Sequence, residues 1–164
     1  MHCFGKQGRC CCVSLKSEQN QYITKATHYL SNLLIKNNIG VATCWNEAAP
    51  CNISLNRQAQ AAKLGVKHAA GTPREFTTIT VTDGIAMGHE GMRSSLASRE
   101  AIADTVELTM RGHCYDALVG FAGCGKSLPG MMMSMVRPHV PSGFMYGGPL
   151  PPGHSMRKVV PAVA

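Results

Sequence analysis

The sequence predicts an α/β protein in which a parallel sheet is flanked by helices. Short segments rich in apolar and β-branched residues alternate along the chain with helical segments of roughly 10 to 15 residues. Residues 116–122 are apolar after the first position, which is typical of a strand buried on both faces of a sheet. A chain of 164 residues with 45% hydrophobic residues can bury one core, so we expect one domain or part of one.

The N-terminal third of the chain contains the first predicted elements. Residues 1–23 show neither a helical nor a strand period, so we leave them unassigned and expect a disordered head. Residues 24–36 have an apolar helical face that ends before an Asn-Asn-Ile-Gly sequence, which predicts a helix. The apolar run 41–45 predicts a strand that leads to Cys51 in a loop bounded by a proline. Residues 55–69 repeat apolar residues at three- and four-residue steps, which predicts the next helix.

The middle of the chain contains the second predicted strand and the longest predicted helix. A Gly-Thr-Pro break precedes the β-branched run 76–81, which we assign to a strand. Residues 82–92 include three glycines and are expected to form a loop, with Asp83 at the exit of the strand. Residues 95–111 repeat apolar residues every four positions and precede a glycine, so a helix is predicted there.

The last predicted elements surround a glycine-rich turn. Strand 116–122 leads into this turn, and a short methionine-rich helix is predicted over residues 129–137. A final strand is predicted over residues 143–146. We assign residues 24–153 to a single partial α/β domain and leave the tail, residues 154–164, unassigned.

Charge and composition exclude several classes of protein. The net charge is +7, but the basic residues are scattered and aromatic residues make up only 5%, so we expect no nucleic-acid partner. Eight cysteines include the consecutive run Cys10 to Cys12, which cannot pair neatly, so reduced thiols are favoured over a disulfide scaffold. No apolar segment is long enough for a targeting signal or a membrane span. We expect a cytoplasmic protein, or an organellar one in a eukaryote, with no membrane partner.

Side chains capable of metal binding follow three of the predicted strands. Cys51, Asp83 and the turn from Cys124 to Lys126 each follow a strand in the same sense. Because ligands gather at the carboxyl ends of parallel strands, these residues could converge on one crevice. Thiolates suit iron–sulfur clusters, and oxygen ligands suit magnesium. Taken singly, each has an ordinary alternative: a buried thiol, a carboxylate that caps a turn, or a solvated lysine.

Five blocks of residues resemble the N-terminal part of the dihydroxy-acid dehydratase and phosphogluconate dehydratase family. The resemblance runs from Ile39 to Gly153, with the blocks in the family's order and spacing, and is closest to the dihydroxy-acid dehydratases. The blocks are Trp45-Asn46-Glu47 with Pro50-Cys51-Asn52, Val81 to Met92, Ser95 to Asp104, Gly123-Cys124-Gly125-Lys126 with Pro129-Gly130, and Tyr146-Gly147-Gly148.

The resemblance implies an incomplete N-terminal domain of a hydro-lyase that converts 2,3-dihydroxy carboxylates into 2-keto acids in branched-chain amino acid biosynthesis. By motif, the resemblance implies that Cys51 and Cys124 are two of three thiolate ligands of an iron–sulfur cluster, either 2Fe-2S or 4Fe-4S. It also implies that Asp83 binds Mg²⁺ and that Lys126 does so as a carbamate. The resemblance also implies a small dihydroxy acid as substrate and a homodimer for full-length members. The third cysteine, a magnesium-binding glutamate and the serine base are expected outside the matched segment, so no catalytic base is assigned here.

Departures from the family pattern predict that this chain alone is inactive. Gly125 stands where the family places an aspartate after the second cysteine, and its loss should weaken magnesium binding. Family members are also several times longer. We interpret the chain as a truncated or diverged copy.

Two other functions are consistent with parts of the sequence. Residues Gly120 to Ser127 satisfy the G-x-x-x-x-G-K-[ST] pattern of a phosphate-binding loop, which would make the chain a nucleotide-binding protein. Pro129 and Gly130 are expected to interrupt the helix that such a loop requires. The methionine-rich segment from Met131 to Met135 could instead belong to a non-catalytic remnant that meets a partner.

Overall fold

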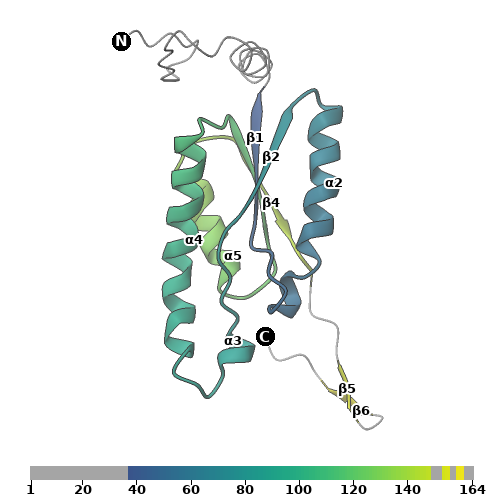
Figure 1. Cartoon of the computed structure of the whole chain (residues 1–164), viewed down its shortest axis with the longest axis vertical. Coiled ribbons are helices and arrows are strands. Elements are labelled where there is room, and N and C mark those ends of the chain that lie inside the picture. Colours follow the sequence, from purple (N-terminus) through teal and green to yellow (C-terminus); the bar gives the residue numbers. More distant parts are fainter. Residues whose placement is uncertain (1–36, 149–152, 156–157, 161–164) are drawn as a thin grey trace, which may run out of the picture.

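The computed structural model describes residues 37–148, 153–155 and 158–160. The head at residues 1–23 and the predicted helix at residues 24–36 lie outside this range. Along the chain the elements are β1 (Asn38–Thr43), a 3-10 turn η1 (Pro50–Asn52), α2 (Leu55–His68), β2 (Thr72–Thr77), α3 (Asp83–Ala86), α4 (Met92–Gly112), β3 (Ala117–Ala122), α5 (Ser127–Val136), β4 (Ser142–Tyr146), β5 (Gly153–Ser155) and β6 (Lys158–Val160) (Figure 1).

Strands β1 to β4 form a parallel sheet in the order β2-β1-β3-β4. Helix α2 lies on one side of the sheet, and α4 and α5 lie on the other (Figure 1). The predicted α/β class and parallel sheet are therefore confirmed. Strands β5 and β6 pair with each other as a separate antiparallel hairpin.

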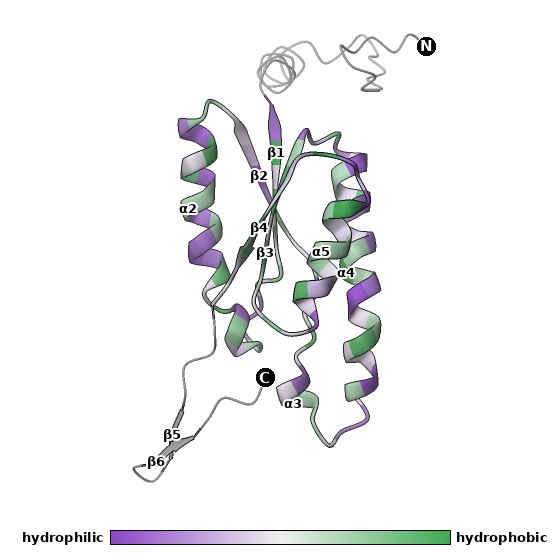
Figure 2. Cartoon of the chain, turned by 180° about the vertical axis from the view of Figure 1, so that it is seen from behind, coloured by the Kyte–Doolittle hydropathy of each residue, from purple (hydrophilic) through white to green (hydrophobic). Residues whose placement is uncertain are grey.

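The core lies between the two central strands and the helices on either side. Its largest fully buried side chains include Leu55 of α2, Phe121 of β3 and Met131 of α5. Helix α5 carries almost no strongly hydrophilic residues, whereas α2 is mixed (Figure 2). Helices α4 and α5 approach closely at Gly130, where an added Cβ would lie 3.0 Å from the Arg99 carbonyl oxygen. In the methionine-rich segment of α5, Met131 is fully buried and belongs to the core, whereas Met132 is half exposed.

The second strand lies earlier in the sequence than expected. We predicted residues 76–81, but β2 ends at Thr77, where the Thr78 N–H donates to the Thr43 carbonyl oxygen at 2.9 Å. Its partner β1 ends at Thr43 and turns away, so no parallel backbone remains for residues 79–81. Pro73 is accommodated inside β2 because this strand is at the edge of the sheet and needs fewer N–H donors.

Helices also begin earlier than the sequence indicated. The predicted loop at residues 82–92 contains the short helix α3, and α4 starts at Met92 rather than near residue 95. Helix α5 starts at Ser127 instead of residue 129, because Pro129 lies in its first turn, where a missing N–H has no intrahelical partner to lose. Among the described residues, no helix is long and apolar enough to cross a membrane.

Candidate active site

The order of the strands creates a crevice between β1 and β3. From β1 the chain moves outward to β2 on one side, and from β3 it moves outward to β4 on the other. Ligands of open α/β sheets bind where the strand order reverses in this way, at the carboxyl ends of the strands. Cys51 lies in η1, after β1, and Cys124 follows the end of β3 by two residues. The two thiols therefore come from neighbouring strands at the reversal point.

The backbone holds these two cysteine segments against each other. A Cβ added at Gly123 would lie 2.2 Å from the Cys51 carbonyl oxygen, so this approach requires glycine. The Cys124 N–H donates to Ser127 Oγ at 3.1 Å, and Ser127 Oγ donates to the Cys124 carbonyl oxygen at 3.0 Å. Ser127 thus closes the turn between β3 and α5 and fixes the orientation of Cys124.

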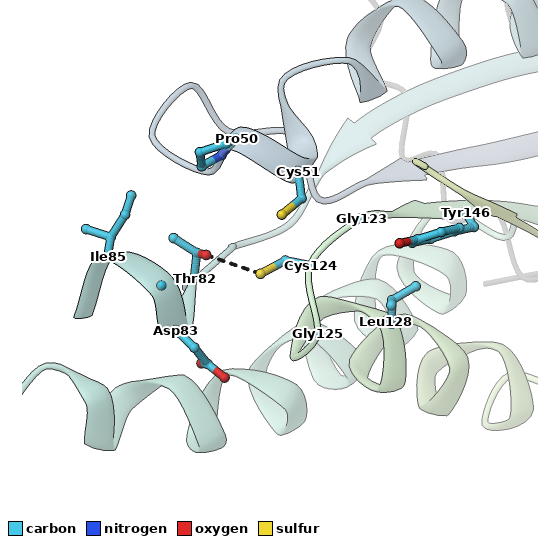
Figure 3. A pocket seen from close by; sticks show the side chains of 11 residues that line it. Pro50, Cys51, Thr82, Asp83, Ile85, Gly123, Cys124, Gly125, Leu128 and Tyr146 are labelled. Carbon is cyan, nitrogen blue, oxygen red and sulfur yellow. Dashed lines mark hydrogen bonds between the residues drawn. The ribbon is translucent and has the colours of Figure 1, made fainter. Parts of the chain in front are cut away.

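Both thiols face the same cavity (Figure 3). Cys124 is 6% exposed, and its Sγ donates to Thr82 Oγ1 at 3.3 Å. Burial raises the pKa of the Cys51 thiol, and the neighbouring Cys124 thiol raises it further. Two thiolates side by side repel each other, so a positively charged metal centre would stabilise both.

The carboxylate and the lysine form an ion pair beside the thiols. Asp83 begins α3, and its Oδ2 lies 2.9 Å from Lys126 Nζ. Its other oxygen accepts a hydrogen bond from Ser95 Oγ of α4. The hydrogen bonds from Ser95 and then Lys126, followed by the charges of Lys126 and Arg99, hold the pKa of Asp83 below its ordinary value. Asp83 is therefore an anion at neutral pH, suited to binding a cation.

The cavity has a volume of about 340 Å³ and combines the two thiols with an apolar wall. The Asp83 carboxylate points away from the thiols, so the sulfur and oxygen donors form two halves of the site (Figure 3). The lining residues are Pro50, Cys51, Thr82, Asp83, Gly84, Ile85, Gly123, Cys124, Gly125, Leu128 and Tyr146. Lys126 does not line the cavity, but it forms an ion pair with Asp83, which does. The structure thus brings together all four residues that the sequence singled out.

These donors match part of the cofactor set that the resemblance implies. Two thiols facing one cavity suit an iron–sulfur cluster, and an ionised carboxylate suits Mg²⁺. The resemblance implies three thiolate ligands for the cluster, whereas the described ranges contain no group of three or more Cys, His, Asp or Glu side chains placed for one metal ion. The described residues therefore fit a portion of such a site.

Gly125, which stands where the family pattern has an aspartate, lies on the exposed rim of the cavity. An added Cβ there would meet nothing within 4 Å, and its φ is outside the left-handed region. The backbone therefore does not require glycine at this position, and a side chain could extend from it into open space.

The phosphate-loop pattern over residues 120–127 does not form a phosphate loop. Residues 120–122 lie inside β3, which pairs with β1 on one side and β4 on the other. Their backbone groups belong to the sheet, and only residues 123–126 remain between strand and helix. The prediction that Pro129 and Gly130 interrupt the start of the helix is wrong, because α5 begins at Ser127 and contains both residues. The strand placement, rather than the proline, argues against this alternative.

Sequence patterns did not point to three residues around the site. Ser95 donates a hydrogen bond to Asp83, Thr82 accepts one from Cys124, and Cys44, directly after β1, is fully buried. Burial raises the pKa of Cys44 to about 12. Hydroxyl residues and a buried cysteine are common in any domain, and only the fold shows which of them adjoin the site.

Together, the sheet order and the crevice define an α/β domain that presents two thiols and a carboxylate at the carboxyl ends of its strands. The sequence model of the dihydroxy-acid/6-phosphogluconate dehydratase N-terminal family matches residues 36–164. The chain therefore belongs to this family.

Curated relatives support the same assignment. The chain is 84% identical over 115 residues to the dihydroxy-acid dehydratase of Dinoroseobacter shibae, which covers 70% of this chain and 20% of the relative. It is 78% identical over 125 residues to the dihydroxy-acid dehydratase of Parvibaculum lavamentivorans, a match that covers 76% of this chain and 22% of that relative. Identity to that of Metallosphaera sedula is 50% over 135 residues, covering 82% and 24%. The chain thus matches about a fifth of the length of these relatives.

Proposed function

We propose that this chain supplies the N-terminal part of the active site of a dihydroxy-acid dehydratase, a hydro-lyase that converts 2,3-dihydroxy carboxylates into 2-keto acids. The observation that carries the proposal is the meeting of Cys51 and Cys124, from neighbouring strands, at one cavity whose lining also includes Asp83. Family membership and the names of the relatives supply the reaction class.

In this proposal Cys51 and Cys124 hold an iron–sulfur cluster, while Asp83 and Lys126 hold Mg²⁺. When bound, the cluster supplies a Lewis acid toward the leaving hydroxyl group. The lining also includes the apolar residues Pro50, Ile85 and Leu128, which supply no ligand and leave coordination to the thiols and the carboxylate.

The protonation of Asp83 favours a role as ligand over one as general acid. Its pKa lies below the ordinary value, so it holds no proton to give at neutral pH. Both its carboxylate oxygens already accept from Ser95 and Lys126, so a magnesium ion would take the place of the lysine ammonium group. Lys126 can join as a carbamate, because CO₂ adds to the neutral amine with loss of a proton and converts the side chain into an oxygen-donor anion.

A chimera tests the proposal directly. Residues 39–153 of this chain replace the corresponding segment of the Dinoroseobacter shibae enzyme, and keto-acid formation is measured under anaerobic conditions. We expect turnover, and more than a roughly 100-fold loss on Cys51→Ser or Cys124→Ser, because loss of a direct ligand exceeds the effect of its supporting partners.

The matched control for the chimera is Cys114→Ser, which changes a cysteine outside the cavity lining and should leave the rate unchanged. Full turnover in the Cys51→Ser and Cys124→Ser chimeras would refute the proposed thiolate roles.

The isolated 164-residue chain should show no dehydratase turnover. Its described part presents only two thiols to the cavity, and the resemblance places the proton-abstracting serine elsewhere. After anaerobic reconstitution with iron and sulfide, absorbance and a keto-acid assay measure cluster and activity separately. Measurable turnover would contradict this expectation, and a stable cluster would show that two thiolates need little help from the remaining sequence.

A further inference from the structure

We propose that Asn52 is a positioning residue that holds together the three segments carrying Cys51, Asp83 and Cys124. The inference rests on the proposed function, because positioning matters only if these residues act as one site. Its evidence is a set of hydrogen bonds and one steric contact around a single fully buried side chain.

Strand pairing ends just before the site begins. Strand β1 stops at Thr43 and β2 at Thr77, and the Thr78 N–H to Thr43 carbonyl bond is the last step of this ladder. The segments that carry Cys51 and Asp83 therefore leave the sheet without the regular backbone pairing that aligned them. Beyond the sheet, hydrogen bonds from side chains must hold these two segments in register instead.

The Asn52 side chain provides that connection between the first two segments. Its Nδ2 donates to the Cys44 carbonyl oxygen at 2.7 Å and to Thr80 Oγ1 at 3.1 Å. Thr80 Oγ1 in turn donates to the same Cys44 carbonyl oxygen at 2.7 Å. Asn52 Nδ2, Thr80 Oγ1 and the Cys44 carbonyl oxygen therefore form a closed triangle of hydrogen bonds. In it, two side chains donate to a backbone carbonyl that lies just beyond the end of β1.

The same side chain also contacts the third segment. A Cβ added at Gly123 would lie 2.7 Å from Asn52 Oδ1, so this oxygen lies directly against the backbone that precedes Cys124. The Asn52 N–H donates to the Ala49 carbonyl oxygen at 2.8 Å, which fixes the turn that carries Cys51. Within the described residues, Oδ1 has no hydrogen-bond partner, so its placement reflects the donors on Nδ2 and the fit against Gly123.

Residue-resolved amide exchange in the 164-residue chain tests this role. Three backbone amides near the triangle report on the segments that it joins. They are those of Cys44, Asn52 and Thr78, which donate to the carbonyl oxygens of Phe121, Ala49 and Thr43 respectively. In Asn52→Ala we expect their protection to fall together by about ten-fold, because the buried Cys44 carbonyl and Thr80 lose a partner. Alkylation of Cys124, which is 6% exposed, should accelerate by a similar factor.

Three further variants separate positioning from general destabilisation. Thr80→Val removes another corner of the triangle and should loosen the same amides, whereas Thr80→Ser keeps the hydroxyl and should behave as the natural chain does. Ser134→Ala removes a buried hydroxyl that donates to the Met131 carbonyl oxygen in α5, and should leave the amides around the triangle protected. If Asn52→Ala does not fold, the comparison of Thr80→Val with Thr80→Ser decides the question.

The proposal is overturned if Asn52→Ala loosens only the Asn52 turn, or if Thr80→Val leaves all three amides unchanged. It is also overturned if the effects of Asn52→Ala and Thr80→Val simply add, because members of one triangle should be coupled. Bound iron is measured in parallel in the chimera with the Dinoroseobacter shibae enzyme, where Asn52→Ala should reduce it. If the chimera with the natural segment binds no iron, the proposed function fails, while the exchange results still test Asn52.

Discussion

The two halves of the site are held by different kinds of interaction. The thiol half lies on segments tied to the central strands, where Gly123 packs against the Cys51 carbonyl and Cys124 is nearly buried. The carboxylate half lies on α3, a four-residue helix beyond the end of β2, where Ile85 and Met87 are 63% and 59% exposed. Asp83 is kept in place by Ser95 and Lys126 side chains.

This difference indicates that the thiol half of the site is preformed. Backbone packing of the thiol half does not depend on ionisation, so its geometry should persist across pH and salt. The carboxylate half depends on an ion pair and a hydrogen bond of partly exposed groups, which pH and salt weaken. Cation binding should therefore rearrange the Asp83 side more than the cysteine side.

The largest effect is expected from Gly123→Ala, which would disrupt the thiol half. The added methyl group cannot coexist with the Cys51 carbonyl oxygen at 2.2 Å, so the backbone must move. Overpacking of this kind costs about 1–3 kcal/mol of unfolding free energy, measured by urea denaturation. Gly125→Ala, two residues away with open space around it, is the matched control and should not destabilise the chain. Equal effects of the two substitutions would show that the thiol half is not tightly packed.

A smaller, pH-dependent effect is expected from the carboxylate half. The pKa of Asp83 is lowered in the folded state, so its stabilising contribution is present above the ordinary value of 3.8 and is lost as pH falls through the folded value. Asp83→Asn should cost at most about 1 kcal/mol at neutral pH, since the pair with Lys126 is partly exposed.

The measurement for this second prediction is the free energy of unfolding between pH 7 and pH 2. The difference between the natural chain and Asp83→Asn should shrink as the carboxyl group is protonated. Lys126→Met should lower stability at neutral pH by a similar small amount and should not add fully to Asp83→Asn. A difference that stays constant across this pH range would mean that the ion pair contributes nothing.

The smallest effect on stability is expected at the rim of the cavity. Gly125→Asp should change the unfolding free energy by no more than about 0.5 kcal/mol in the absence of divalent cations, because its side chain enters open space. Added Mg²⁺ should then raise the melting temperature of this variant, since a second carboxylate joins Asp83. Gly125→Asn, of equal size but neutral, is the control. Equal responses of the two variants to Mg²⁺ would argue against a cation site here.

Much of the fold was predictable because burial leaves a local pattern. Residues 116–122 and 55–69 carried clear strand and helix signals, and β3 and α2 lie almost where these signals placed them. The second strand was misplaced because its β-branched run extends past the point where β1 can pair with it. Propensity identifies residues that suit a strand, but only a neighbouring backbone makes them one.

The chain's own residues determined the chemistry available to it: two thiols, a carboxylate and a lysine after successive strands, and an α/β class that directs such residues to one edge of the sheet. Tertiary structure alone decided that β1 and β3 are neighbours, so that the two thiols share a cavity, and that Asp83 is paired with Ser95 and Lys126. The physical reason is the separation along the sequence of the residues that interact. Side-chain periodicity reflects contacts within a few residues, whereas strand order and the hydrogen bonds around Asn52 join segments tens of residues apart.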